Sequence, residues 1–255
     1  MIYQYLSESV NIKKISETST EGVFEVEGLY TGYGLTIGNA LRRILLSSLP
    51  GAAITKFKIK TVGHQFSTVP GVMEDVVEMG LNLKKIRFQI FSDEPQILTL
   101  KVKGARAVTA FDIETNDQVE LVTPDAHIAT LTEKSAELEM ELTVEKGLGY
   151  IPAEALKKDK LPIGEIALDA LFSPVVNVNF SVENMRVGDR TDFNRLRLEI
   201  KTDGTITPSS ALRKSSNILQ DHFTKISQIE VKEVEAVKAD GKEKKTKTKK
   251  KKEKE

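Results

Sequence analysis

The chain has 255 residues, of which 40% are hydrophobic and none is cysteine. This length supports one large or two small domains, and the lack of cysteine excludes disulfides, cysteine zinc sites and thiol catalysis. No apolar run approaches the roughly 20 residues of a membrane-spanning helix. The N-terminal segment MIYQYLSESV lacks the basic and apolar regions of a signal peptide. We therefore expect a cytosolic protein that does not enter a membrane.

The formal net charge of zero hides an uneven charge distribution. Ten lysines and four acidic residues lie between Lys238 and Glu255, so this segment carries about +6 and the remaining chain about −6. Its low-complexity sequence, KADGKEKKTKTKKKKEKE, is typical of disorder. We predict that the folded part ends near Ile229 or Val231.

The first expected strand is GVFEVEGLY, in which apolar and polar residues alternate. A helix is predicted over Thr36–Leu49, ended by Pro50 and Gly51. At 100° per residue, its inward face carries Ile37, Ala40, Leu41, Ile44, Leu45 and Ser48. The opposite face carries Asn39, Arg42 and Leu46, with Arg43 on the flank. Arginines alone fit a solvated face, but arginines beside an exposed leucine are typical of protein interfaces.

The middle of the chain is predicted to form antiparallel strands, since its short alternating segments are bounded by Gly, Pro or Asp. These segments are ITKFKIKTV, IRFQIF, ILTLKVKGA, VELVTP and AELEMELTVEKG. Two longer strands, SPVVNVNFSVENM and RLRLEIKTDGTI, precede a second helix with Thr207 or Ser209 as its cap and Pro208 in its first turn. The apolar stripe of that helix contains Ala211, Leu212, Ile218, Leu219, Phe223 and Ile226. The fold class is therefore α+β.

The glycine-rich turn GYGLTIG (Gly32–Gly38) raises the possibility of a nucleotide site. Its spacing, G-x-G-x-x-x-G, differs by one residue from the dinucleotide fingerprint, and no Gly-Lys-Ser/Thr follows. A dinucleotide fold would also need alternating strands and helices. The glycines more simply permit a tight turn with positive φ. A stand-alone nucleotide-binding enzyme using the Gly32–Gly38 turn remains the less favoured alternative.

The titratable residues offer little chemistry. Glu74, Asp75 and Glu78 lie close together in the sequence, and paired carboxylates can bind Mg²⁺, but a solvated acidic face is the simpler interpretation. The three histidines, at positions 64, 127 and 222, have no metal-ligand spacing. We predict no catalytic, cofactor-binding or metal-binding residue in this chain.

Four motifs together carry a family resemblance. TIGNALRRILLSSLPGAAIT resembles the signature helix of the α subunit of bacterial and plastid RNA polymerase. The resemblance continues, in the same order, through GVMEDVVEMGLNLKKI, GLGYIPAE and the long stretch from LPIGEIALDALFSPVVNVNFSVENM to ALRKSSNIL. One twenty-residue motif and three collinear ones are highly specific, and the resemblance reaches about residue 231.

The resemblance implies the two-subdomain fold of the N-terminal region of α. A discontinuous dimerisation subdomain, residues 1–50 and 178–231, is interrupted by a strand-rich insert, residues 51–177, and followed by the lysine-rich tail, residues 232–255. The family member is a homodimeric scaffold that nucleates assembly of the β and β′ subunits. The implied dimer interface, combined with the apolar stripes above, comprises Ile37, Leu41, Leu45, Leu212, Leu219, Phe223 and Ile226.

The resemblance also implies partner contacts and a division of labour. The contacts to β map onto Arg43 and Leu46, and those to β′ map onto Lys84 and Arg190. The catalytic Mg²⁺ belongs to β′, so this chain would be a non-catalytic subunit of a nucleotidyltransferase, located in the bacterial cytosol or the plastid stroma. In most members a helical DNA-binding domain follows; here the lysine-rich tail stands in its position. The chain would then contact DNA only as part of the holoenzyme, or weakly and non-specifically through its lysine-rich tail.

Overall fold

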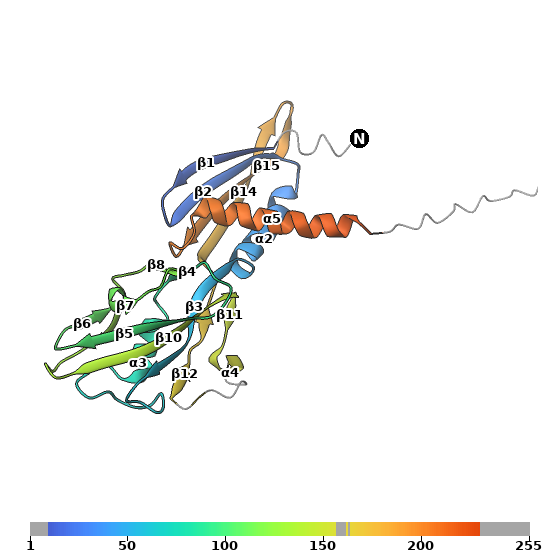
Figure 1. Ribbon diagram of the computed structural model, residues 1–255. Coiled ribbons are helices and arrows are strands. Elements are labelled where there is room, and N and C mark those ends of the chain that lie inside the picture. Colours follow the sequence, from blue (N-terminus) through green and yellow to red (C-terminus); the bar gives the residue numbers. More distant parts are fainter. Residues whose placement is uncertain (1–9, 157–161, 163, 230–255) are drawn as a thin grey trace, which may run out of the picture.

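The computed structural model describes residues 10–156, 162 and 164–229. Its two larger sheets have separate apolar cores (Figure 1). The lysine-rich tail lies outside the described residues. We call the part built on the four-stranded sheet the small-sheet unit and the part built on the seven-stranded sheet the large-sheet unit. Helices and antiparallel strands both contribute, so the predicted α+β class is confirmed.

The small-sheet unit draws its strands from the two ends of the chain. Its antiparallel order is β1 (Asn11–Glu17), β2 (Glu21–Leu29), β15 (Arg190–Thr202) and β14 (Val175–Val187). Strand β2 pairs with β15 far along the chain, for example Phe24 opposite Leu198. Strand β14 begins at residue 175, slightly before the predicted boundary at residue 178. The four-stranded sheet thus pairs strands that come before and after the large-sheet unit in the sequence.

Helix α2 (Tyr33–Ser47) packs on β14 and β15 through glycines. A Cβ atom on Gly34 would lie 2.7 Å from Val182 Cγ1, and one on Gly38 would lie 2.7 Å from Phe180 Cδ2. Such distances are far below ordinary van der Waals contact, so a side chain at either position would push the helix off the sheet. The two glycines, one helical turn apart, therefore allow α2 to approach the sheet closely.

Helix α5 (Pro208–Ser227) begins where the sequence predicted and is fixed to the edge strand β1. The Thr207 side chain accepts a hydrogen bond from Ser210 N, which confirms Thr207 as the N-cap. Glu17 Oε1 accepts a second bond from Ser209 N at 2.9 Å. Hydrogen bonds from the side chain and backbone of Ser209, together with the ammonium of Lys14, hold the pKa of Glu17 at about 2, below its ordinary value of 4.5.

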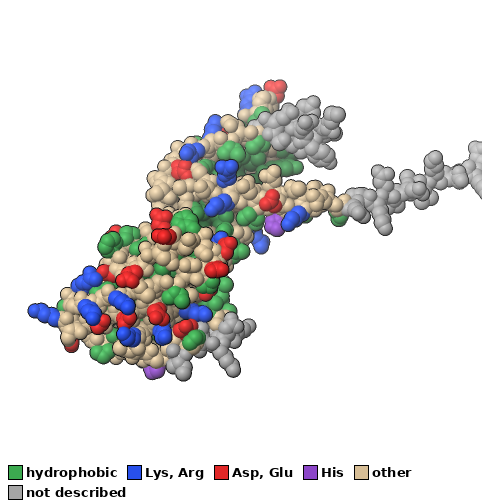
Figure 2. Space-filling model, viewed as in Figure 1, with side chains coloured by type: hydrophobic (Ala, Val, Ile, Leu, Met, Phe, Trp, Pro, Cys, Tyr) green, Lys and Arg blue, Asp and Glu red, His purple; other side chains and the backbone are tan. Residues whose placement is uncertain are grey.

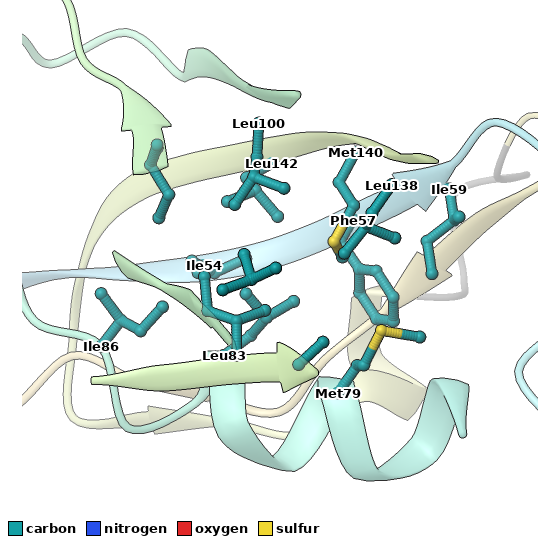
Figure 3. Close-up of a cluster of buried hydrophobic side chains, with 14 of the residues drawn as sticks. Ile54, Phe57, Ile59, Met79, Leu83, Ile86, Leu100, Leu138, Met140 and Leu142 are labelled. Carbon is teal, nitrogen blue, oxygen red and sulfur yellow. The ribbon is translucent and has the colours of Figure 1, made fainter. Parts of the chain in front are cut away.

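The large-sheet unit encloses the larger core. Its strand order is β7 (Ile113–Glu114), β5 (Gln96–Lys103), β10 (Glu137–Leu148), β3 (Pro50–Ile59), β4 (Phe88–Ile90) and β8 (Val119–Leu121), with β12 (Glu165–Ala167) also paired to β3. Helix α3 (Val76–Leu83) covers one face of this sheet. Figure 3 shows Met79 and Leu83 of the helix pointing toward Phe57, Met140 and Leu142 of the strands.

The remaining elements are short and lie around the large sheet. Strand β6 (Ala107–Thr109) pairs with β9 (His127–Thr130), and β11 (Tyr150–Ile151) pairs with β13 (Ala170–Leu171). A 3-10 turn, η1 (Ala110–Asp112), follows β6, and α4 (Ala153–Leu156) follows β11. None of the helices in the described part of the chain is long and apolar enough to cross a membrane.

The contact between Glu17 and α5 generates a prediction about pH. The pKa of Glu17 is depressed in the folded protein, so its contribution to stability is present above about pH 4.5 and is lost as the pH falls toward 2. We expect Glu17→Gln to lower the melting temperature at pH 7. The difference between the two proteins should shrink as the pH is lowered through this window. Thermal unfolding followed by circular dichroism at several pH values checks this, and a difference that is independent of pH would contradict it.

Candidate functional site

The predicted β-contacting residues lie on α2. Arg43 is exposed, while Leu46 is half-buried against the small-sheet core. The sequence placed Leu46 on the face away from the core, and this was only partly right, because its side chain packs against the edge of that core. Arg43 is thus an exposed arginine beside a leucine that is partly exposed.

The helix itself begins at Tyr33, earlier than the predicted Thr36, and ends at Ser47, before the predicted Leu49. At its start, Gly32 adopts φ of +85°, a conformation that glycine accepts without strain. Gly32 N and Gly34 N donate to Asn194 Oδ1 at 2.8 and 3.4 Å. A side chain from a distant strand therefore caps the helix, which local sequence patterns do not reveal.

This cap also bears on the nucleotide alternative. A phosphate bound at a glycine-rich turn accepts hydrogen bonds from the backbone N–H groups at the start of the following helix. Here Asn194 already occupies two of these donors, and Asn194 is itself buried. The turn is therefore a structural feature of the small-sheet unit, and nothing supports the nucleotide-binding interpretation.

Lys84, a predicted β′ contact, lies directly after α3. Its Nζ is 2.8 Å from Asp169 Oδ2, and the Asp169 carboxylate also accepts a bond from Ala153 N. The bond from Ala153, followed by that from Lys84, lowers the pKa of Asp169. This pair lies at the side of a cleft of about 260 Å³ between α3 and β12, where Phe66, Val77 and Leu81 are exposed.

Arg190, the other predicted β′ contact, lies at the tip of the β14–β15 hairpin. Its guanidinium forms a two-bond pair with Asp192, at 3.0 and 2.7 Å, and lies 4.9 Å from the ring centre of Tyr30 and 5.1 Å from that of Phe193. The bonds from Arg190, with one from Thr31, hold the pKa of Asp192 at about 2. The arginine is thus rigidly oriented and half-exposed.

The structure does not bring Lys84 and Arg190 together in one chain. Figure 1 places α3 at the opposite end of the molecule from the β14–β15 hairpin tip. Their partners, Asp169 for Lys84 and the aromatic pair for Arg190, were not singled out from the sequence. Asp169 lies 85 positions from Lys84 in the sequence, and a pair so far apart cannot be predicted from local sequence patterns.

The predicted dimer residues fall into two groups. Leu41 and Leu45 are buried within the core of the chain itself, so we remove them from the proposed dimer surface. Ile37, Leu212 and Leu219 are half-buried at the edge of that core. In contrast, Phe223 and Ile226 have 63% and 66% of their surface exposed, and they lie on the C-terminal half of α5, which extends beyond the sheet in Figure 1.

The acidic cluster has a structural explanation. Asp75 caps α3 by accepting a bond from Glu78 N at 2.6 Å. Glu74 is buried and accepts bonds from Thr130 N and from His127 Nε2. Burial raises the pKa of Glu74, but these bonds outweigh the burial and leave the pKa below its usual value. Among the described residues, no three His, Cys, Asp or Glu side chains gather as metal ligands.

Charges on the large sheet are distributed in opposite-sign pairs. Figure 2 shows lysine and arginine side chains interspersed with acidic ones over this unit. Glu139 of β10 lies between Lys60, which directly follows β3, and Lys101 of β5, with its carboxylate oxygens 2.7 and 2.9 Å from the two Nζ atoms. These two lysines hold the pKa of Glu139 at about 2. Among the described residues, these ion pairs place charges of opposite sign side by side on the sheet.

Comparison with known proteins agrees with this geometry. The profile of the RNA polymerase Rpb3/RpoA insert domain family matches residues 57–173, which lie within the large-sheet unit. A DNA-directed RNA polymerase subunit alpha from Alkaliphilus oremlandii is 47% identical over 214 residues, which are 84% of this chain and 67% of the relative.

The chain belongs to the RNA polymerase α-subunit family. Two further α subunits support this assignment. The one from Symbiobacterium thermophilum is 49% identical over 209 residues, and the one from Moorella thermoacetica is 50% identical over 202 residues. These alignments cover 82% and 79% of this chain, but 66% and 64% of the relatives. The chain thus spans about two thirds of the length of the curated family members that it matches.

The cap on α2 generates a prediction about stability. Asn194→Ala removes the acceptor for Gly32 N and Gly34 N, and a buried donor left without a partner costs about 1–3 kcal/mol. We expect the free energy of unfolding to fall by this amount in a urea titration. Asn179→Ala, an exposed position on β14, is the matched control and should change it by less than about 0.5 kcal/mol. Equal effects of the two substitutions would contradict the capping role.

Proposed function

We propose that the chain is a non-catalytic scaffold subunit of DNA-directed RNA polymerase, which dimerises and then binds the β and β′ subunits. The observation that carries the proposal is the exposed apolar stripe of α5 in a chain of the α-subunit family. The relatives are named as subunits of this enzyme, and the partner-contact residues implied by the family lie on three different elements of the surface.

The dimer is proposed from apolar surface that one chain does not cover. Phe223 and Ile226 on α5 are exposed, and so are Ile12 and Ile15 on the edge strand β1 of the same unit. Isolated exposed apolar residues are normal, but a helix that presents a continuous stripe of them past its own sheet is typical of an interface. A second copy related by a two-fold axis would cover the stripe with the same stripe of its own.

Dimerisation can be measured directly. Light scattering should give about twice the chain mass of 28.3 kDa. Phe223→Asp combined with Ile226→Asp should shift the protein to the monomer mass while the circular dichroism spectrum is unchanged, because both side chains are exposed. The control is Phe111→Asp, which places the same charge at an exposed phenylalanine of η1 and should leave the dimer intact. A dimer that persists in the double variant would refute the proposed surface.

The partner contacts are proposed on residues that one chain leaves exposed or partly exposed. Arg43 and Leu46 would bind β, and Lys84 and Arg190 would bind β′. In a symmetric dimer each protomer carries both sets, so binding of two different partners requires that each protomer uses a different set. The chain itself would hold no cofactor, with the catalytic Mg²⁺ in the β′ subunit.

DNA contact through the lysine-rich tail remains a proposal from the sequence alone. Its lysines would release counterions from phosphates, so the contact would be weak, non-specific and sensitive to salt. Since the relatives are bacterial, we infer a location in the bacterial cytosol.

Arg43 offers a second test. It lies off the apolar face of α2, so Arg43→Ala should fold and dimerise normally. Loss of a hydrogen-bonded charge at an interface commonly costs roughly 2–5 kcal/mol, so capture of the β subunit in a pull-down should fall sharply. Arg213→Ala removes an exposed arginine from α5 and serves as the control. Normal capture by Arg43→Ala, or failure of that variant to fold, would overturn the assignment.

A further inference from the structure

The two units of the chain are joined by few contacts. The chain passes from the small-sheet unit to the large-sheet unit at Pro50 and returns near Val175. The two crossings lie against each other, since a Cβ on Gly51 would come within 1.9 Å of the Phe172 carbonyl oxygen. The helices and strands of one unit share few contacts with those of the other in the described part of the chain. Two adjacent crossings without other support would act as a hinge.

Arg87 makes a third connection between the units. It belongs to the large-sheet unit, where its backbone is fixed by bonds from its N–H to Thr123 Oγ1 and from Val122 N to its carbonyl. Its side chain reaches out of this unit, with Nε 3.6 Å from Asp203 Oδ2 and Nη1 donating to the Leu171 carbonyl at 3.2 Å. The guanidinium therefore contacts both the returning crossing and the small-sheet unit.

Asp203 is held in place from the other side. It lies between β15 and α5, and its Oδ1 accepts bonds from Thr205 N and Thr205 Oγ1, which leaves Oδ2 facing Arg87. The Asp203 N–H donates to the Pro174 carbonyl at 3.0 Å. The next residue, Gly204, approaches Val122 of the large-sheet unit. The carboxylate is thus part of a rigid turn that faces the junction.

Burial distinguishes this pair from the other ion pairs. The Arg87 side chain is 18% exposed and that of Asp203 is 8% exposed, whereas most of the other pairs contain at least one widely exposed partner. Among the ion pairs of the described residues, it is the one that joins the two units. Opposite charges with little access to solvent are screened weakly, and separating them would leave each charge without its partner.

We propose that the Arg87–Asp203 ion pair locks the two units at one angle, and that this angle sets the spacing between Arg190 at the tip of the β14–β15 hairpin and Lys84 beside α3, the two residues proposed to contact β′. These two residues lie in different units, so a free hinge would vary the distance between them. Partner subunits that span both units would then bind only the fraction of molecules with the right spacing. The locking role stands on the geometry alone, while the positioning role rests on the proposed function.

The locking role is tested by measuring a distance across the junction. The chain contains no cysteine, so Glu141→Cys on β10 and Glu183→Cys on β14 provide the only two positions for spin labels. Labelled chains are diluted with excess unlabelled chain, so that electron–electron double resonance reports the distance within one chain. In the background of Asp203→Asn, which keeps the oxygen that binds Thr205, the distance distribution should broaden and shift.

Glu137→Gln is the matched control, because it converts a carboxylate to an amide in an ion pair within one sheet. Its distance distribution should equal that of the unsubstituted protein. Arg87→Gln is the second variant and should reproduce the effect of Asp203→Asn. A distribution that is unchanged in both junction variants would overturn the locking role.

The positioning role is tested by titrating the β and β′ subunits against the same proteins. If the correctly spaced fraction falls to about one tenth, the apparent affinity for β′ falls about tenfold. The affinity for β and the dimer mass stay unchanged, because Arg43 and Leu46 lie on one helix. A broadened distribution with unchanged affinity for β′ would overturn the positioning role alone. If the unsubstituted chain binds neither subunit, the proposed function fails, and the distance measurement still decides the locking role.

Discussion

The close approach of α2 to β14 and β15 is the contact on which the small-sheet unit depends. Glycines at positions 34 and 38 let the helix axis come near the strands, and this brings Leu41 and Leu45 into the core. Helix α5 then packs on α2, so the placement of the second helix follows from that of the first. The same contact fixes which flank of α2 faces outward, and Arg43 is on that flank. One helix–sheet contact therefore sets both the core packing and the outward direction of the flank that carries Arg43.

Much of this arrangement could be predicted from the sequence, because it is encoded locally. Strict alternation in AELEMELTVEKG and RLRLEIKTDGTI marks strands with one buried face, and both form long strands here. The Thr207–Pro208 pair marked the start of α5 because its cap and fixed φ act within one turn. The order of the motifs identified the family, which then implied a discontinuous unit that periodicity alone does not show.

The remaining features depend on residues that are distant in the sequence. The start of α2 is capped by Asn194, about 160 positions later, and Leu46 is half-buried against a core that is built from distant strands. Amphipathic periodicity gives the apolar face of a helix but cannot say whether its own chain or a second chain covers that face. For this reason Leu41 and Phe223 were assigned to one surface, although one is buried in the core and the other is exposed. The pairing of Arg87 with Asp203 has no local signal at all.

The interrupted strand order also has a consequence for synthesis on the ribosome. Strand β2 and helix α2 emerge early, but their partners β14 and β15 follow only after the whole large-sheet unit has been made. At roughly 5–20 residues per second, the segment between Leu29 and Val175 takes about 7–30 s to synthesise. During this time the apolar faces of β2 and α2 have no sheet to pack on, while the large-sheet unit already has all its strands. The nascent chain therefore completes its inner unit first, and the earliest residues to appear are among the last to be buried.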